Sequence, residues 1–103
     1  MKYFDPSSRR WYVYLLKCSD GSLYCGSTNN LIKRIKDHGA GVGARYTRSR
    51  LPITLVYSEV QESRPFALKR ELEIKSWPKE RKIELVTFGR KGTRRKNPLV
   101  VLK

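Results

Sequence analysis

One segment, residues 11–38, constrains the fold of this chain more than any other. Residues 11–17 (WYVYLLK) are apolar, aromatic and β-branched, which suits a pleated, half-buried strand. Asp20-Gly21 then signals a tight turn, because glycine reaches positive φ at no steric cost. Residues 23–26 follow as a short return strand. The segment therefore predicts a β-hairpin.

A helix is expected directly after this hairpin. Thr28, Asn29 and Asn30 are candidate N-caps, since their short polar side chains can accept hydrogen bonds from the first free amides of a helix. Apolar residues then recur at helical spacing up to His38. Glycines follow from residue 39, so the helix is expected to end there.

The length of the hairpin loop decides whether Tyr14 and Tyr24 share a face of the sheet. A two-residue Asp-Gly loop would pair Lys17 with Tyr24 and place the two tyrosines on opposite faces. A three-residue loop that ends in a left-handed Gly21 would pair Leu16 with Tyr24. Side chains alternate along a strand, so the second register places both phenols on one face. A site shared by both tyrosines requires this second register or a bulge elsewhere, so we predict the three-residue loop.

Four polar side chains of this segment can converge. Arg34 and His38 share one helix face, and Tyr14 and Tyr24 lie on paired strands. A guanidinium group suits phosphate oxygens, and a phenol can act as a base once nearby cations lower its pKa. These groups together could bind a phosphate and supply a base.

The same residues carry a family resemblance. The segments 12–14 (YVY) and 24–26 (YCG), with an arginine ten positions after the second tyrosine and a histidine four positions later, resemble the GIY-YIG nuclease superfamily. The resemblance extends over residues 11–86 and is strongest to its small stand-alone bacterial proteins. Tyr12 stands where the family has its first glycine, and Cys25 replaces an isoleucine.

The resemblance implies an α/β (α+β) fold, with a three-stranded antiparallel sheet flanked by three helices in a single domain. Residues 53–58 (ITLVYS) fit the third strand, and residues 66–77 and 79–88 fit the remaining helices. The domain is expected to span residues 11–88. A flexible basic arm (1–10) precedes it, and a basic tail (89–103) follows it.

Glu71 is expected to face the protein interior. It lies in the middle of the apolar stripe expected on its helix, formed by Ala67, Leu68, Leu72 and Ile74. A carboxylate placed there needs a partner, which is either a salt bridge to Lys75 or Arg34 or a metal ion. The resemblance implies the metal, because the family's metal-binding glutamate lies in a helix after the third strand. Glu73 is the fallback ligand, although helical phase places it on the polar side.

The charge of the chain favours a polyanionic partner. The 103 residues carry a formal net charge of +14, and no apolar run is long enough to span a membrane. Arginines interleave with an aromatic residue and hydroxyls in residues 45–50 (RYTRSR), which fits phosphate contacts and base stacking, although a solvated surface loop is the alternative. The expected nucleic-acid-binding residues are Lys33, Arg45, Tyr46, Arg48 and Arg50.

Localisation and cysteine chemistry follow from the remaining sequence signals. The first ten residues lack an apolar signal region, so a cytoplasmic protein is expected. Cys18 and Cys25 lack further metal ligands at suitable spacing and are interpreted as small packing residues. Neither cysteine is expected to form a disulfide in that compartment.

The activity implied by the resemblance is metal-dependent endonuclease cleavage of nucleic acid, with DNA favoured over RNA. One Mg²⁺ or Mn²⁺ ion would bind to Glu71, and Arg34 would hold the phosphate. Tyr14 or Tyr24 would orient or deprotonate the attacking water, and His38 would support a tyrosine or the phosphate. Targeting would come from a protein partner, or specificity would be low. The alternatives are a non-catalytic DNA- or RNA-binding protein that keeps the nuclease scaffold and a ribosome-associated basic protein.

Overall fold

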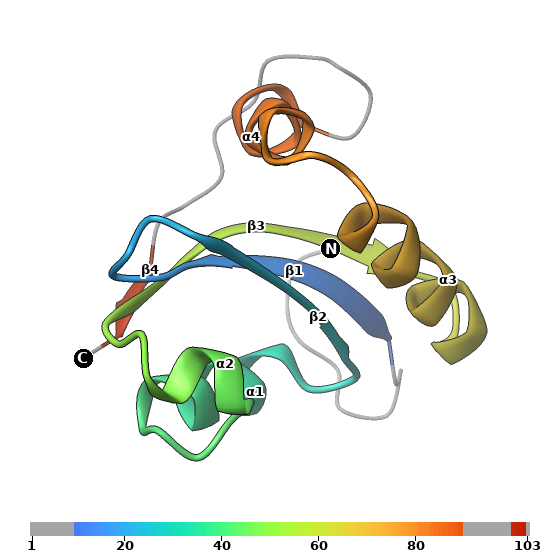
Figure 1. Cartoon of the computed structure of the whole chain (residues 1–103). Coiled ribbons are helices and arrows are strands. Elements are labelled where there is room, and N and C mark those ends of the chain that lie inside the picture. The colour runs from blue at the N-terminus through green and yellow to red at the C-terminus, as the bar shows by residue number, and fades with distance from the viewer. Residues whose placement is uncertain (1–9, 90–99, 103) are drawn as a thin grey trace.

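The computed structural model describes residues 10–89 and 100–102. These residues form four strands and four helices, and the fold is α+β (Figure 1). In chain order the elements are β1 (Trp11–Lys17), β2 (Leu23–Thr28), α1 (Leu31–Gly39), α2 (Arg45–Arg48), β3 (Ile53–Gln61), α3 (Arg64–Lys75), α4 (Lys79–Phe88) and β4 (Val100–Leu102). The expected arm and most of the expected tail lie outside the described residues.

The sheet is antiparallel, with the strand order β2-β1-β3-β4. Leu16 pairs with Tyr24 and Tyr14 pairs with Gly26, which is the register of a three-residue loop. Gly21 has a φ of 84°, a backbone conformation that residues other than glycine rarely adopt. The predicted register is therefore confirmed, and Tyr14 and Tyr24 lie on the same face.

Helices cover both faces of the sheet (Figure 1). On one face α3 and α4 pack over a core that includes Val13, Leu15 and Tyr57. On the other face α1 packs over Tyr14 and Leu16. Alternate side chains of β1 thus pack into two separate hydrophobic cores, one on each face of the sheet. Strand β2 is the edge strand, with α1 on one side and α3 on the other.

Besides shifts of two residues in the bounds of β2 and α3, three features differ from the sequence prediction. Residues 45–48 form the one-turn helix α2 where a loop was expected, so the described residues contain four helices rather than three. Strand β3 continues to Gln61, three residues beyond the predicted end. Residues 100–102 add a short fourth strand to the sheet. Each difference depends on a tertiary partner, since short polar or apolar segments adopt regular structure mainly where packing or pairing supports it.

The N-cap of α1 and the burial of both cysteines agree with the sequence prediction. Asn30 is the N-cap of α1, because its side chain accepts a hydrogen bond from the backbone amide of Lys33. Cys18 and Cys25 are both buried, which agrees with their interpretation as small packing residues. In the described part of the chain, no helix is both long and apolar enough to cross a bilayer.

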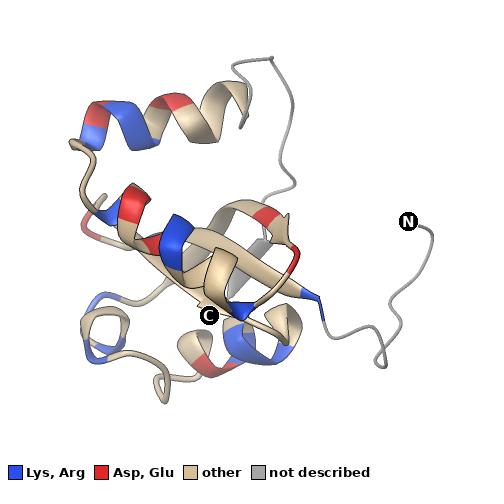
Figure 2. Ribbon diagram, turned by 90° about the vertical axis from the view of Figure 1, so that its right-hand side faces the viewer, with Lys and Arg blue, Asp and Glu red and all other residues tan. Residues whose placement is uncertain are grey.

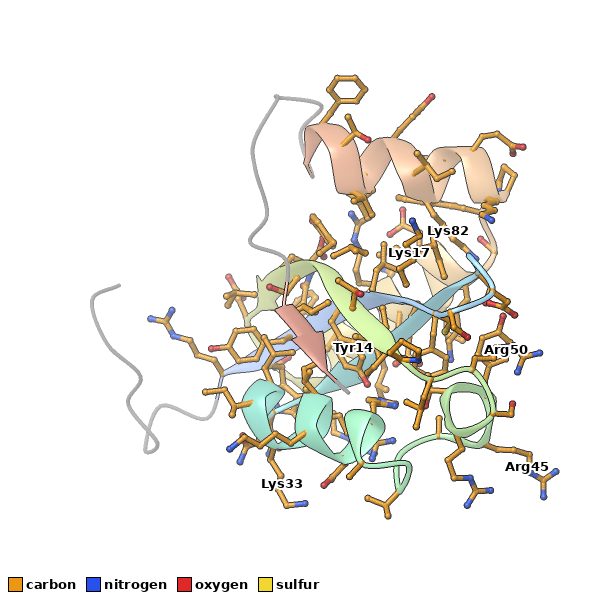
Figure 3. The ribbon with its side chains drawn as sticks, turned by 90° about the vertical axis from the view of Figure 1, so that its left-hand side faces the viewer. Tyr14, Lys17, Lys33, Arg45, Arg50 and Lys82 are labelled. Carbon is orange, nitrogen blue, oxygen red and sulfur yellow. The ribbon has the colours of Figure 1, made fainter. Side chains whose placement is uncertain are left out.

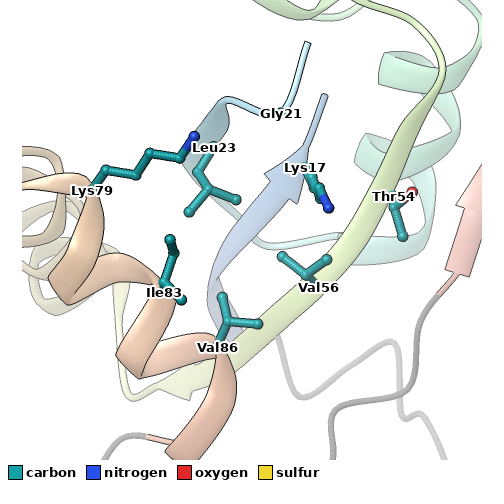
Figure 4. A pocket seen from close by; sticks show the side chains of 8 residues that line it. All are labelled: Lys17, Gly21, Leu23, Thr54, Val56, Lys79, Ile83 and Val86. Carbon is teal, nitrogen blue, oxygen red and sulfur yellow. The ribbon is translucent and has the colours of Figure 1, made fainter. Parts of the chain in front are cut away.

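Helix α4 leaves an apolar cavity between itself and the hairpin end of the sheet (Figure 4). The cavity has a volume of about 750 Å³. Leu23, Val56, Ile83 and Val86 line it, and Lys17 and Lys79 also contribute to its wall. It lies on the sheet face covered by α3 and α4, away from Tyr14. A mostly apolar wall without a carboxylate, a histidine or an arginine does not suit the proposed phosphate chemistry, so the candidate site lies elsewhere.

Candidate active site

The ring of Tyr14 lies against Gly26 of the neighbouring strand. The two residues pair across β1 and β2, and only 1% of the Tyr14 surface is exposed. A Cβ atom built on Gly26 would lie 2.6 Å from Cζ of Tyr14, closer than real Cβ contacts come. The glycine of the second motif is therefore a space requirement: it lets the phenol of β1 lie over the edge strand.

The imidazole of His38, on α1, is fully buried and has a hydrogen-bond partner at each nitrogen. Nε2 lies 2.9 Å from the hydroxyl oxygen of Tyr14, and Nδ1 lies 2.8 Å from Oγ1 of Thr47. Burial, together with the charge of Arg34, lowers the pKa of His38 to about 4. The histidine is therefore neutral near pH 7.

Tyr24 shares the sheet face of Tyr14, but its hydroxyl has different surroundings. Its ring centroid lies 6.5 Å from that of Tyr14 and 5.3 Å from that of His38. Tyr24 is half-buried, and its hydroxyl makes no hydrogen bond to any of the described residues. Of the two phenols, Tyr24 is therefore the one available to a water molecule or a substrate.

Arg34 projects from α1 toward the cluster formed by Tyr14, Tyr24 and His38. Its guanidinium is close enough to the Tyr14 hydroxyl to oppose the rise of the Tyr14 pKa, and close enough to His38 to lower the imidazole pKa. The Tyr14 pKa is nevertheless raised, because burial outweighs the nearby cation. The expectation that basic surroundings lower the pKa of a phenol is wrong for Tyr14, which stays protonated.

Glu71 approaches β2 from α3, on the opposite side of the sheet from α1. Its carboxylate accepts a 2.6 Å hydrogen bond from Ser27 of β2 and forms a 2.6 Å ion pair with Lys75. Its side chain is 16% exposed, and its charge acts on the pKa of Tyr14. The carboxylate therefore lies beside the edge strand, within electrostatic reach of the tyrosine cluster.

The expected apolar stripe of this helix is only half correct. Ala67 and Ile74 are fully buried, whereas Leu68 is 40% and Leu72 69% exposed. The inward face of α3 thus holds Glu71 between two small or medium apolar residues, and the leucines point outward. The ion pair with Lys75, one of the two explanations left open for this carboxylate, is present in the structure.

The donor groups around Glu71 test whether a metal ion suits this position. One carboxylate and the hydroxyl of Ser27 supply only oxygen atoms, which hard cations such as Mg²⁺ prefer, and Mg²⁺ keeps several of its waters when bound by a single carboxylate. Within residues 10–89 and 100–102, no group of three or more acidic, histidine or cysteine side chains could enclose an ion. Glu71 therefore fits an open, hydrated site rather than a closed cage.

Several positions along the ribbon of α1 and α2 are lysine or arginine (Figure 2). Arg45 and Arg48 are exposed, and Lys33 is exposed with a surface ion pair to Asp37. Lys33 and Arg45 point outward from their helices (Figure 3). Tyr46 and Arg50 are less available for substrate, because the Arg50 guanidinium lies 3.8 Å from the centroid of the Tyr46 ring and also pairs with Asp20.

Replacing Gly26 with alanine should disrupt this cluster without touching a charged residue. The new methyl group would collide with the ring of Tyr14, which is too deeply buried to move freely. We expect a loss of about 1–3 kcal/mol in the free energy of unfolding, measured by urea denaturation, which is typical of overpacking. Gly41→Ala is not a matched control, because Gly41 has a positive φ; Ala40→Ser on the exposed helix cap is suitable. An unchanged stability for Gly26→Ala would contradict the packing described here.

Comparison with known proteins gives one consistent result. The family model described as the GIY-YIG catalytic domain matches residues 10–84. A UPF0213 protein of Staphylococcus saprophyticus is 46% identical over 78 residues, which cover 76% of this chain and 95% of the relative. A UPF0213 protein of Haloquadratum walsbyi is 49% identical over 78 residues, covering 76% of this chain and 88% of the relative.

A solved structure is also similar. The solution NMR structure of a UPF0213 protein from Bacillus halodurans has 43% sequence identity and a TM-score of 0.50, and the match covers 75% of this chain and 82% of that chain. The family match contains every residue of the candidate active site, from Tyr14 to Glu71.

Proposed function

The chain belongs to the GIY-YIG family, and from this premise we propose that it is a metal-dependent endonuclease. It would hydrolyse phosphodiester bonds in nucleic acid, with DNA favoured over RNA. The observation that carries the proposal is that Tyr24, Arg34 and Glu71, from three separate elements of the chain, flank the edge strand β2 closely enough for all three to act on the Tyr14 hydroxyl.

In this proposal Arg34 binds the phosphate to be cleaved. A guanidinium presents several donors in one plane, which matches the non-bridging oxygens of a phosphodiester. The same positive charge stabilises the extra negative charge that develops in the transition state. Arg34 is half-buried beside Tyr14 and His38, so its orientation is restricted before the substrate binds.

The two tyrosines have different roles. Tyr24 orients the attacking water, because its hydroxyl has no partner among the described residues. Tyr14 remains protonated, bound to His38, and supports the position of Arg34. Water oxygen forms the new bond to phosphorus, and the bond to the 3′ oxygen breaks, which leaves a 3′ hydroxyl and a 5′ phosphate after protonation.

Glu71, assisted by Ser27, would hold one Mg²⁺ or Mn²⁺ ion. When bound, such an ion stabilises charge on the leaving oxygen and on the phosphate. Lys75 already provides a positive charge at this carboxylate and would have to give way to the ion. Lys33, Arg45 and Arg48 would contact the phosphate backbone on either side of the cleaved bond, which suits the net charge of +14.

A second candidate is a non-catalytic nucleic-acid-binding protein. The ion pair between Glu71 and Lys75 favours it, because it neutralises the carboxylate without a metal. Under either function we place the protein in the cytoplasm, with sequence preference low or supplied by a protein partner.

A cleavage assay separates the two candidates. Purified protein is incubated with single- and double-stranded DNA and RNA in the presence of Mg²⁺, Mn²⁺ or EDTA. We expect cleavage of DNA with either ion and none with EDTA, and the products should carry 5′ phosphates. Binding without cleavage of any substrate, at any concentration of either ion, would leave the second candidate as the function.

A further inference from the structure

Helix α2 is only one turn long, yet two of its consecutive residues contact the cluster. Thr47 is fully buried and lies 2.8 Å from Nδ1 of His38. The ring of Tyr46 stacks on that of Tyr24, with the centroids 5.9 Å apart and the planes inclined by 25°. A segment expected to be a substrate-binding loop is thus part of the inner structure of the site.

Several contacts hold this segment in place. The guanidinium of Arg50 pairs with Asp20 in the hairpin turn at 2.9 Å, and its backbone carbonyl accepts a 2.9 Å hydrogen bond from the amide of Ser19. On the other side, Gly43 lies against the imidazole of His38, since a Cβ atom there would be 2.9 Å from Cγ of that ring. The connection between α1 and β3 is therefore fixed to both the hairpin and the histidine.

The hydroxyl of Thr47 has a single proton, and its partners determine where that proton points. Oγ1 lies 3.0 Å from the carbonyl oxygen of Ala44, which can only accept. Thr47 must therefore donate to Ala44 and accept from His38. Nδ1 then carries the proton of the neutral imidazole, and Nε2 must accept the hydrogen bond from the Tyr14 hydroxyl.

We propose that Thr47 is a positioning residue that selects the Nδ1–H tautomer of His38 and thereby fixes the Tyr14 hydroxyl as a donor to Nε2. The lone pairs of the Tyr14 oxygen are then free to accept a hydrogen bond from the guanidinium of Arg34. Thr47 thus restricts the orientation of the Tyr14 hydroxyl without touching it. The consequence for catalysis rests on the proposed nuclease function. The tautomer itself does not, because it is a property of the protein alone.

The chain contains one histidine, which makes the tautomer directly measurable. Long-range ¹H–¹⁵N spectra of uniformly ¹⁵N-labelled protein at pH 7 report which ring nitrogen carries the proton. We expect the Nδ1–H form in the wild type and in Thr47→Ser, which keeps the hydroxyl. In Thr47→Val, which has the same shape without the hydroxyl, we expect the Nε2–H form to become populated and cleavage to fall about tenfold, as for the loss of one buried hydrogen bond.

The two proposals fail in different ways. An Nε2–H wild-type histidine, or a Thr47→Val protein with an unchanged tautomer, would overturn the role of Thr47 whatever the cleavage assay shows. An inactive wild type whose tautomer still responds to Thr47→Val would support the role of Thr47 and contradict the nuclease. If the valine variant does not fold, Thr47→Ala, which also lacks the hydroxyl, takes its place, and an unchanged tautomer in that variant would overturn the role of Thr47.

Discussion

Glu71→Gln is expected to abolish divalent-metal-dependent cleavage. The amide has the shape of the carboxylate but lacks its charge, so it still accepts the hydrogen bond from Ser27 and no longer holds a divalent cation. Charge stabilisation by an active-site metal is worth several kcal/mol, so the cleavage rate should fall about 100-fold or more. Initial rates at several Mg²⁺ and Mn²⁺ concentrations measure this loss.

Glu73→Gln is the matched control for this variant. Glu73 lies two positions further along α3, is exposed, and pairs only at the surface with Arg70. We expect wild-type cleavage from Glu73→Gln and wild-type affinity for DNA from both variants, measured by fluorescence anisotropy. Equal rates for Glu71→Gln and the wild type would show that Glu71 is only the ion-pair partner of Lys75, and would remove the metal site from the proposal.

Arg34→Ala should lower the cleavage rate by a similar factor, because it removes the group that binds the phosphate rather than the metal ligand. Removing one preorganised group that stabilises transition-state charge typically costs about 10²- to 10³-fold in rate. Arg34→Lys keeps the positive charge but loses the planar set of donors, and it should recover only part of the activity. Single-turnover rates with excess enzyme give the chemical step directly.

Lys33→Ala provides the comparison on the same helix. Its ammonium is on the exposed face of α1, with 70% of the side chain accessible. We expect this variant to bind DNA slightly more weakly, and its affinity should depend less steeply on salt concentration. The rate at which bound DNA is cleaved should not change. If Arg34→Ala also altered only binding, the arginine would be a backbone contact rather than part of the catalytic centre.

Local sequence signals predicted the hairpin, and the requirement that Tyr14 and Tyr24 share a site selected its register. Gly21 permits the left-handed turn, and the turn fixes the register that puts Tyr14 and Tyr24 on one face. The spacing of Arg34 and His38 likewise required only the geometry of a helix. Family resemblance added Glu71, whose place beside β2 no local pattern could show.

Other features depend on contacts between distant parts of the chain. Helix α2 lies in a sequence of arginines and hydroxyls that resembles a surface loop, and nothing in that pattern marks Thr47 as buried. The helical pattern also did not predict that Leu68 and Leu72 are exposed. A periodic pattern shows which side chains share a face, but the packing of α3 against the sheet decides which face is buried.

The amino-acid sequence by itself determined the hairpin, the helix that follows and the identity of the polar residues. These depend on backbone conformations and spacings within a few residues of each other. Only the tertiary structure decided that burial raises the pKa of Tyr14, that Tyr24 is the more accessible of the two phenols and that Thr47 is bonded to His38. Protonation and hydrogen bonding depend on burial and on neighbouring charges, which exist only after distant segments have packed together.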